Sequence, residues 1–73
     1  MELVTESKIV GEFTGWNGDN VYELANGRRW QQSRYKYQYR YKYRPTAKVW
    51  KDGSRHYLEV DGMDSMVDVR RIT

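Results

Sequence analysis

Short runs of apolar and aromatic residues alternate with polar residues along the chain, and glycine-containing turns separate these runs. No helical period of 3.6 residues persists for more than one turn. Asn-Gly and Asp-Gly pairs supply the positive φ angles that tight β-hairpin turns need. The pattern therefore predicts an all-β domain, a meander of antiparallel strands. The turn pairs are Asn17-Gly18, Asn26-Gly27, Asp52-Gly53 and Asp61-Gly62.

Five or six strands are expected between these turns. Gly11 and Gly15 interrupt the first strand, which indicates a bend or a bulge. Asp61–Met66 is expected to form one helical turn, because its two methionines are three residues apart. Residues 1–7 are predicted to be a flexible N-terminal tail, and residues 8–73 a single domain. The predicted strands are Lys8–Trp16, Asn20–Ala25, one that begins with Arg28–Gln32 and continues into the tyrosine-rich segment, Thr46–Lys51, Arg55–Val60 and Val67–Ile72.

The most regular segment is Tyr35–Tyr43, in which five tyrosines alternate with two lysines, a glutamine and an arginine. In a strand, a period of two places all the tyrosines on one face and the other four residues on the opposite face. Nine residues at about 3.3 Å each span about 30 Å, which is long for a small domain. We therefore expect this strand to bend sharply or to project as a hairpin, and Pro45 to end it.

Aromatic side chains are expected to supply much of the core, because seven tyrosines and three tryptophans stand beside only twelve Leu, Ile and Val residues. The tyrosine face of Tyr35–Tyr43 is therefore predicted to be mainly buried. In an unbroken strand, Trp30 and Gln32 would lie on the face opposite the tyrosines. Burying both Trp30 and the tyrosines thus predicts a β-bulge between residues 31 and 34.

The net charge of +3 conceals a segregation of charge along the chain. Residues 1–27 carry a net charge of −4, residues 28–55 carry +9 and residues 56–73 carry −2. The basic middle segment is either a positive face for a polyanion or a strand neutralised by acidic neighbours, and the second interpretation is favoured.

Several classes of protein are disfavoured by the composition. The chain has no cysteine for a disulfide or a thiolate metal site, and no apolar stretch approaches the roughly 18–20 residues of a membrane span. The N-terminal residues lack the basic start and apolar core of a signal peptide. We therefore expect a cytoplasmic protein without membrane partners.

Candidate catalytic residues are few. His56 is the only histidine, and no serine lies in the context of an activated nucleophile. Asp61, Asp64 and Asp68 do not have the spacing of a calcium loop and are interpreted as turn and capping residues. We expect no enzymatic activity, no metal site and no cofactor.

Two kinds of binding site remain. The first interpretation is a protein-interaction module, monomeric or weakly dimeric, with an aromatic groove for an unknown protein or peptide. The alternative is a site for single-stranded RNA or DNA on the basic face of strand 35–43, contacting phosphates without stacking because the aromatic rings lie on the other face. The groove candidates are Trp16, Tyr22, Trp50 and Tyr57, and the nucleic-acid candidates are Arg34, Lys36, Arg40, Lys42 and Arg44.

The order of several motifs resembles a family of small bacterial proteins. These motifs are Gly11-Glu-Phe-Thr-Gly-Trp16-Asn-Gly18, Tyr22-Glu-Leu-Ala-Asn-Gly27, Trp30-Gln-Gln32, the tyrosine run ending in Tyr43-Arg-Pro45, and Val67-Asp-Val-Arg-Arg-Ile72. The resemblance covers most of residues 8–73 and implies an SH3-like barrel. Such proteins are mostly described as uncharacterised, so the resemblance implies no catalytic or ligand-binding residue. Where the family usually has glutamine after Asn26-Gly27, this chain has Arg28, which adds positive charge.

Overall fold

The structure is a computed structural model that describes all 73 residues, and it is all-β, as the sequence predicts. It has eight strands rather than five or six, because β1 and β5 are separate strands and Lys8–Trp16 contributes only its second half to β2. The strands are β1 (Glu2–Lys8), β2 (Glu12–Asn17), β3 (Val21–Glu23), β4 (Arg29–Gln32), β5 (Tyr37–Tyr43), β6 (Thr46–Asp52), β7 (Arg55–Val60) and β8 (Val67–Arg71).

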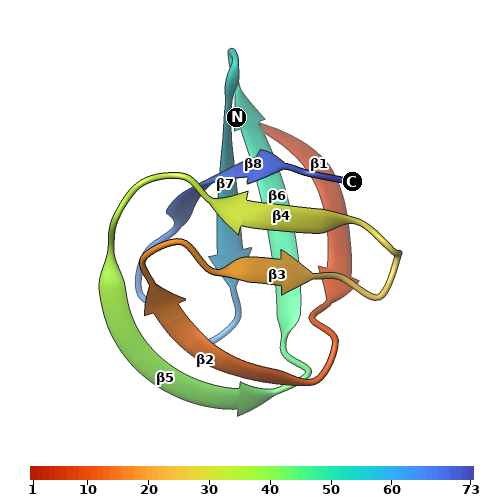
Figure 1. Ribbon diagram of the computed structural model, residues 1–73. Helices are drawn as coiled ribbons and strands as arrows, with labels where there is room; N and C mark the ends of the chain where they lie inside the picture. Colours follow the sequence, from red (N-terminus) through yellow and green to blue (C-terminus); the bar gives the residue numbers. More distant parts are fainter.

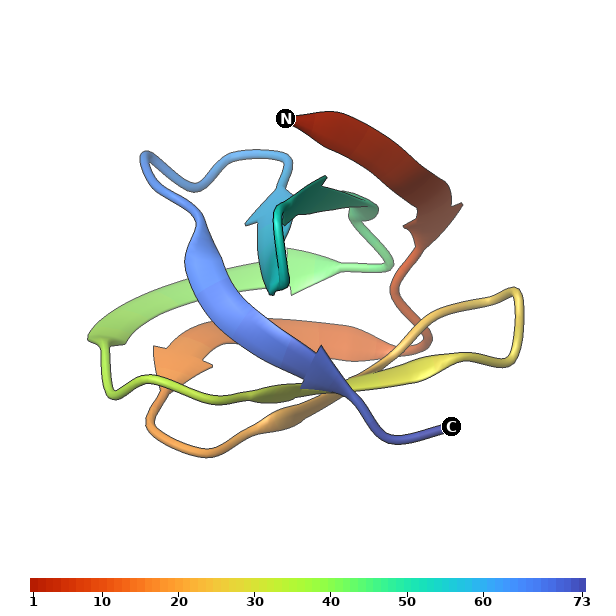
Figure 2. The same cartoon turned by 90° about the horizontal axis from the view of Figure 1, so that it is seen from above.

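The strands form two antiparallel sheets. Six of them make a sheet in the order β1-β6-β7-β8-β4-β3, and β2 pairs with β5. Figure 1 shows β3 and β4 running across the direction of β6 and β7, with the strongly curved β2–β5 pair below them. Seen from above in Figure 2, β1 and β8 lie on either side of β6 and β7.

The larger sheet curls on itself without closing fully. An isolated bridge between Ile9 and Leu24 joins the chain just after β1 to the chain just after β3. Two backbone hydrogen bonds flank this bridge, from Val10 N to Glu23 O (2.9 Å) and from Ala25 N to Lys8 O (2.8 Å). The two outer strands of the sheet therefore meet at one end, which gives the molecule the form of a small roll.

The core lies between the curled sheet and the β2–β5 pair. The Phe13 and Trp16 rings of β2 meet edge to face, with centroids 5.5 Å apart, and Trp16 meets Tyr22 in the same way at 5.7 Å. Edge-to-face pairs of this kind contribute about 0.5–1.5 kcal/mol beyond the burial of their area. The other buried hydrophobic residues are Ile9, Leu24, Trp30, Ala47, Val49, Leu58, Val60, Val67 and Val69.

Residues 1–7 do not form the predicted flexible tail, because Glu2–Lys8 is strand β1. It pairs antiparallel with β6, and Leu3 stands opposite Trp50. All seven side chains of β1 are exposed or half-buried, so the strand is held mainly by its backbone ladder. An edge strand without a buried face leaves little trace in the hydrophobic pattern, which explains the wrong prediction.

A loop replaces the predicted bulge between residues 31 and 34. Strand β4 ends at Gln32, whose side chain is only 3% exposed. The Nε2 of Gln32 donates to the carbonyl oxygens of Arg34 and Lys36, each at 3.0 Å. One buried amide thus holds the whole connection between β4 and β5.

Segment 61–66 forms a turn and a bend rather than a helical turn. The amide of Met63 donates to the carbonyl of Val60 at 3.0 Å, and Met63 packs against the core, whereas Asp64 and Ser65 are exposed. The residues that follow the turn are held by side chains of β5, as described below.

Tyr22 contributes a buried hydroxyl, 3.0 Å from the carbonyl oxygen of Gly15 and 3.3 Å from Oε1 of Gln32. Burial raises the pKa of Tyr22 from 10.0 to about 12, although a hydrogen bond with Asn20 acts in the opposite direction. The unfolded chain therefore loses this proton near pH 10, while the folded protein keeps it until about pH 12.

The free energy of unfolding is therefore expected to decrease as the pH rises from 10 to 12. Two pKa units correspond to about 2–3 kcal/mol, and this contribution is fully present below pH 10. Urea unfolding across this range measures it. Tyr22→Phe is the control, because it lacks the titrating hydroxyl and therefore this part of the pH dependence. Its free energy of unfolding at neutral pH is expected to be about 1–2 kcal/mol lower than that of the wild type. Parallel curves for the two proteins would contradict the prediction.

Candidate functional site

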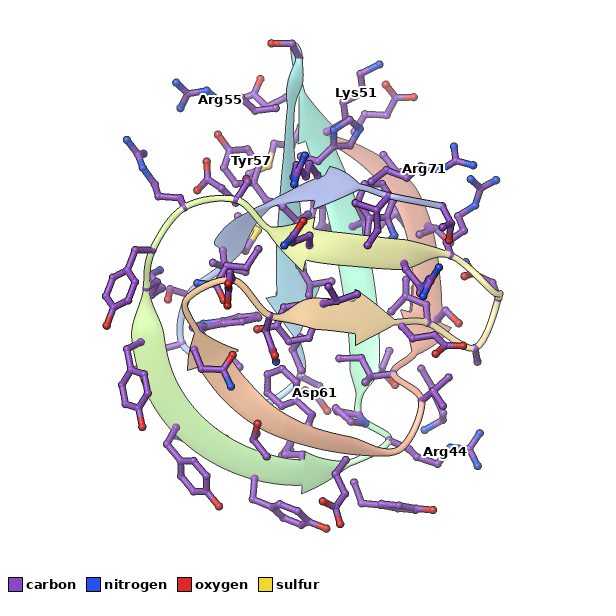
Figure 3. All side chains as sticks on the ribbon, in the orientation of Figure 1. Arg44, Lys51, Arg55, Tyr57, Asp61 and Arg71 are labelled. Carbon is purple, nitrogen blue, oxygen red and sulfur yellow. The ribbon has the colours of Figure 1, made fainter.

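The tyrosine row, which we define as Tyr35, Tyr37, Tyr39, Tyr41 and Tyr43, points into solvent. The prediction that this face is buried is therefore wrong: the exposed fraction of these side chains runs from 51% at Tyr41 to 78% at Tyr35. Figure 3 shows aromatic rings projecting from the outer side of β5 with their hydroxyl groups outermost. The row is an exposed aromatic surface along one strand.

The face of β5 opposite the tyrosine row, together with Lys36 directly before the strand, holds segment 61–66 in place. The Nζ of Lys36 donates to Ser65 Oγ (2.9 Å) and to the carbonyl of Met66 (3.0 Å). Arg40 Nη1 donates to the carbonyl of Gly62 at 2.9 Å. Two of the cations predicted to contact phosphates, Lys36 and Arg40, thus donate hydrogen bonds within the protein.

Two further side chains complete these contacts. Gln38 Nε2 donates to Asp64 Oδ1 at 3.2 Å. Lys42 is half-buried, and its aliphatic stem runs so close to Gly62 that an added Cβ would lie 2.7 Å from Lys42 Cε. Because Gln38 and Lys42 lie on the same face as Lys36, the non-aromatic face of β5 packs against segment 61–66.

The pairing of β2 with β5 explains how this strand can curve. The register shifts between Phe13 and Gly15, which lets both Phe13 and Trp16 enter the core although they are three residues apart. Gly15 has a φ of 101°, and an added Cβ there would overlap the carbonyl oxygen of Gln38. The tyrosine row therefore depends on a close backbone approach that only glycine permits.

Cations flank the tyrosine row at its C-terminal end. A pocket of about 460 Å³ is lined there by Tyr41 and Tyr43 together with Lys8, Lys42 and Arg44. Arg44 is exposed and has a φ of 50°, and it is the only residue other than glycine with a positive φ. Asp61 is the one acidic residue of this lining.

A second cationic surface lies at the N-terminal end of the tyrosine row. Arg34, directly before Tyr35, lines a pocket of about 410 Å³ with three arginines from β7 and β8. We call it the arginine pocket. Its four arginines are Arg34, Arg55, Arg70 and Arg71.

One acidic side chain, that of Glu12 in β2, lies beside the row. Partial burial among its neighbours raises the pKa of Tyr41, and the negative charge of Glu12 and a hydrogen bond with Glu12 raise it further. Tyr41 therefore stays neutral and keeps its proton well above neutral pH. Glu12 stands opposite Tyr43 at the edge of the row.

Comparison with family models, curated proteins and solved structures finds no match. No group of three or more His, Cys, Asp or Glu residues comes together as a metal site. His56, the lone candidate for acid–base chemistry, is half-buried with its ring 5.3 Å from that of Trp30. None of the elements is a helix long and apolar enough to cross a membrane.

The four residues predicted to form a peptide groove fall into two groups. Trp16 and Tyr22 are 0% and 3% exposed and belong to the core, so they line no groove. Trp50 and Tyr57 are half-buried and stand opposite each other on β6 and β7. Trp50 Nε1 donates a hydrogen bond to Glu59 Oε1 at 2.8 Å. The Trp50 side chain also lines a separate, largely apolar pocket of about 380 Å³.

The tyrosines of the row were missed as candidate binding residues. Lys36, Gln38 and Lys42 are half-buried on the inner side, opposite the tyrosines. The alternation within residues 35–43 separates the two faces but does not say which of them is buried. The aromatic side chains of the core come instead from β2, β3 and β4.

Proposed function

We propose that this protein binds single-stranded nucleic acid, with the tyrosine row as its stacking surface. The observation that carries the proposal is a line of five exposed tyrosines with cationic residues at both ends. Monomeric proteins seldom leave a contiguous aromatic surface uncovered unless it binds something. Proteins that bind single strands without sequence preference combine such aromatic platforms with positively charged surfaces.

The spacing of the row suits bases that are unstacked from one another. Alternate residues of a strand are about 6.6 Å apart, roughly twice the 3.4 Å rise between stacked bases. Each ring of the tyrosine row can therefore receive one base of an extended strand. Stacking on an aromatic side chain contributes about 1–3 kcal/mol per base and tolerates any sequence.

Phosphate contacts are assigned to the ends of the row rather than to the inner face of β5. Arg34 and Arg44 are exposed, and Lys8 lines the same pocket as Arg44. Lys36 and Arg40 keep their hydrogen bonds to segment 61–66. This assignment retains Arg34 and Arg44 of the basic residues predicted from the sequence, and Lys42 lines the same pocket as Arg44.

Arg44 provides a test because its backbone is strained. A side chain at positive φ costs about 1–2 kcal/mol, and glycine removes this cost, although its greater freedom in the unfolded chain offsets about 0.5–1 kcal/mol. We therefore expect Arg44→Gly to be as stable as the wild type or slightly more stable. Its affinity for a single-stranded oligonucleotide is expected to fall several-fold, and the dependence of that affinity on salt to become shallower.

Fluorescence anisotropy of a labelled oligonucleotide at low and moderate salt measures both quantities. Arg44→Lys is the matched control, because it keeps the charge and the strained backbone. Absence of binding by the wild type at low salt would overturn the proposed function. Equal affinities of Arg44→Gly and Arg44→Lys would remove Arg44 from the site.

The pocket beside Trp50 favours a second candidate function, the docking of a peptide. Its other lining residues include Met63 and Met66, which are flexible apolar side chains, and the carboxylates of Glu59 and Asp64. This combination suits a peptide with an apolar side chain next to a lysine or arginine. Amide shifts confined to this pocket on adding such a peptide would favour the docking of a protein partner.

The proposal also includes the absence of enzymatic activity, the type of fold and the cellular compartment that the sequence predicts. We propose a non-enzymatic binding module whose small roll is of the SH3-like kind, in a cytoplasmic setting. The support is the all-β topology together with the resemblance in motif order.

A further inference from the structure

Three segments that are distant in sequence build the arginine pocket. They are the loop between β4 and β5, the start of β7 with the turn before it, and β8. The amide of Ser33 donates to the carbonyl of Asp68 at 2.8 Å, which fixes the loop against β8. His56 stands opposite Val69 in the β7–β8 ladder. The backbone therefore holds these side chains around one opening.

The pocket has a strong excess of positive charge. Its lining includes four arginines and a single carboxylate, that of Asp68. Arg70 Nη2 donates to Gln31 Oε1 at 2.8 Å, and Arg71 Nε donates to the carbonyl of Thr73 at 3.3 Å. A guanidinium has five N–H donors, so each of these side chains is positioned by one bond and keeps others for a ligand.

The size and lining of the pocket define the chemistry of that ligand. Arginine forks bind phosphate oxygens in pairs, and the hydroxyl groups of Ser33 and Ser54 add further donors. The volume of about 410 Å³ exceeds the space that one phosphate group fills, and Val69 is the one hydrophobic residue of the lining. The pocket thus has room for neighbouring phosphates and offers a base only one hydrophobic side chain.

We infer that the arginine pocket binds two neighbouring phosphate groups. Pyrophosphate is one source of them, and successive phosphates of a bound strand are the other. Arg34 lines the pocket and directly precedes Tyr35, the first tyrosine of the row. A single nucleic-acid strand that continues past Tyr35 therefore reaches the pocket. Figure 3 shows Arg55 and Arg71 in the upper part of the molecule, away from Arg44 in the lower part. The binding of a nucleic-acid strand at this pocket rests on the proposed function, whereas the binding of pyrophosphate does not.

Titration with pyrophosphate, followed by amide chemical shifts, tests the pocket without any nucleic acid. Shifts are expected at residues 54–56 and 68–71. The double variant Arg55→Ser/Arg71→Ser, altered at two exposed positions, is expected to bind pyrophosphate at least tenfold more weakly. Asp68→Asn, which removes the opposing carboxylate, should bind it several-fold more tightly. Lys51→Ser is the matched control and should bind as the wild type does, because this exposed cation lies outside the pocket.

Oligonucleotides of two lengths separate this inference from the proposed function. A strand of eight nucleotides should bind at least tenfold more tightly than one of five, and the double variant should lose this difference. If pyrophosphate causes no shift at the pocket and length has no effect, the inference is wrong while the tyrosine row can still bind a strand. If pyrophosphate binds and neither strand does, the pocket is supported and the proposed function fails.

Discussion

Gly15→Ala is expected to lose about half of the stability of the fold. Two independent costs add at this position. A side chain at a φ of 101° is strained by about 1–2 kcal/mol. The new Cβ would also overlap the Gln38 carbonyl oxygen and lie 2.8 Å from Arg40 N, and the backbone displacement this forces costs about 1–3 kcal/mol.

The sum, about 2–5 kcal/mol, is large for this chain. A domain of 73 residues has a free energy of unfolding of about 4–11 kcal/mol at the usual 0.05–0.15 kcal/mol per residue. Gly27→Ala is the matched control, because Gly27 has a φ of 89° and an added Cβ there would meet nothing within 4 Å. Urea unfolding should show the backbone cost alone for Gly27→Ala. Equal losses in the two variants would show that the close approach of β2 and β5 costs nothing.

Replacing two tyrosines of the row is expected to abolish most nucleic-acid binding without unfolding the protein. Tyr39 and Tyr41 are 65% and 51% exposed, so the double alanine variant loses little packing. Each lost ring should weaken binding by about 1–3 kcal/mol, so the pair lowers the affinity by roughly 30-fold or more. The matched control Tyr39→Phe/Tyr41→Phe keeps both rings and should bind nearly as tightly as the wild type.

The stability of the same variant tests the orientation of the row. Truncating a buried aromatic ring to alanine costs about 3–5 kcal/mol, whereas exposed substitutions cost roughly 0.5 kcal/mol or less. The double alanine variant should therefore unfold at nearly the same urea concentration as the wild type. A loss of several kcal/mol would mean that these rings are packed in the core, which contradicts the structure described above.

Local patterns in the sequence were sufficient to predict the hairpins. Asn26-Gly27 closes the β3–β4 hairpin and Asp52-Gly53 the β6–β7 hairpin, and β7 has the predicted bounds Arg55–Val60. These features depend on turn residues and on alternation within one strand, both of which can be read from neighbouring residues.

The orientation of the tyrosine row was a different kind of problem. Counting apolar residues indicated that the tyrosines were needed inside, but Phe13, Trp16 and Trp30 fill the core with Val and Leu side chains from β6, β7 and β8. Tyrosine suits either location because its ring is apolar and its hydroxyl is polar. The alternation alone does not decide between the two faces, because a loop separates β5 from β4, in which Trp30 and Gln32 are buried.

The arginine pocket could not be predicted at all. Its residues come from three segments that are separated by at least ten residues. The pairing of β8 with both β4 and β7 and the Ser33–Asp68 hydrogen bond bring them together. The role of Lys36 and Arg40 in holding segment 61–66 depends in the same way on contacts between distant parts of the chain. Charge along the sequence indicates how many cations there are, but not which of them are free to bind a ligand.

The central claim, that the tyrosine row binds single strands by stacking, is tested most directly by following the tyrosine ring protons during titration with a short single-stranded oligonucleotide. Stacking beneath a base shifts ring protons upfield, so we expect this shift for the exposed tyrosines of β5 and none for the buried ring of Tyr22. Binding that leaves the ring signals of the row unchanged would contradict the claim, as would the absence of binding at low salt.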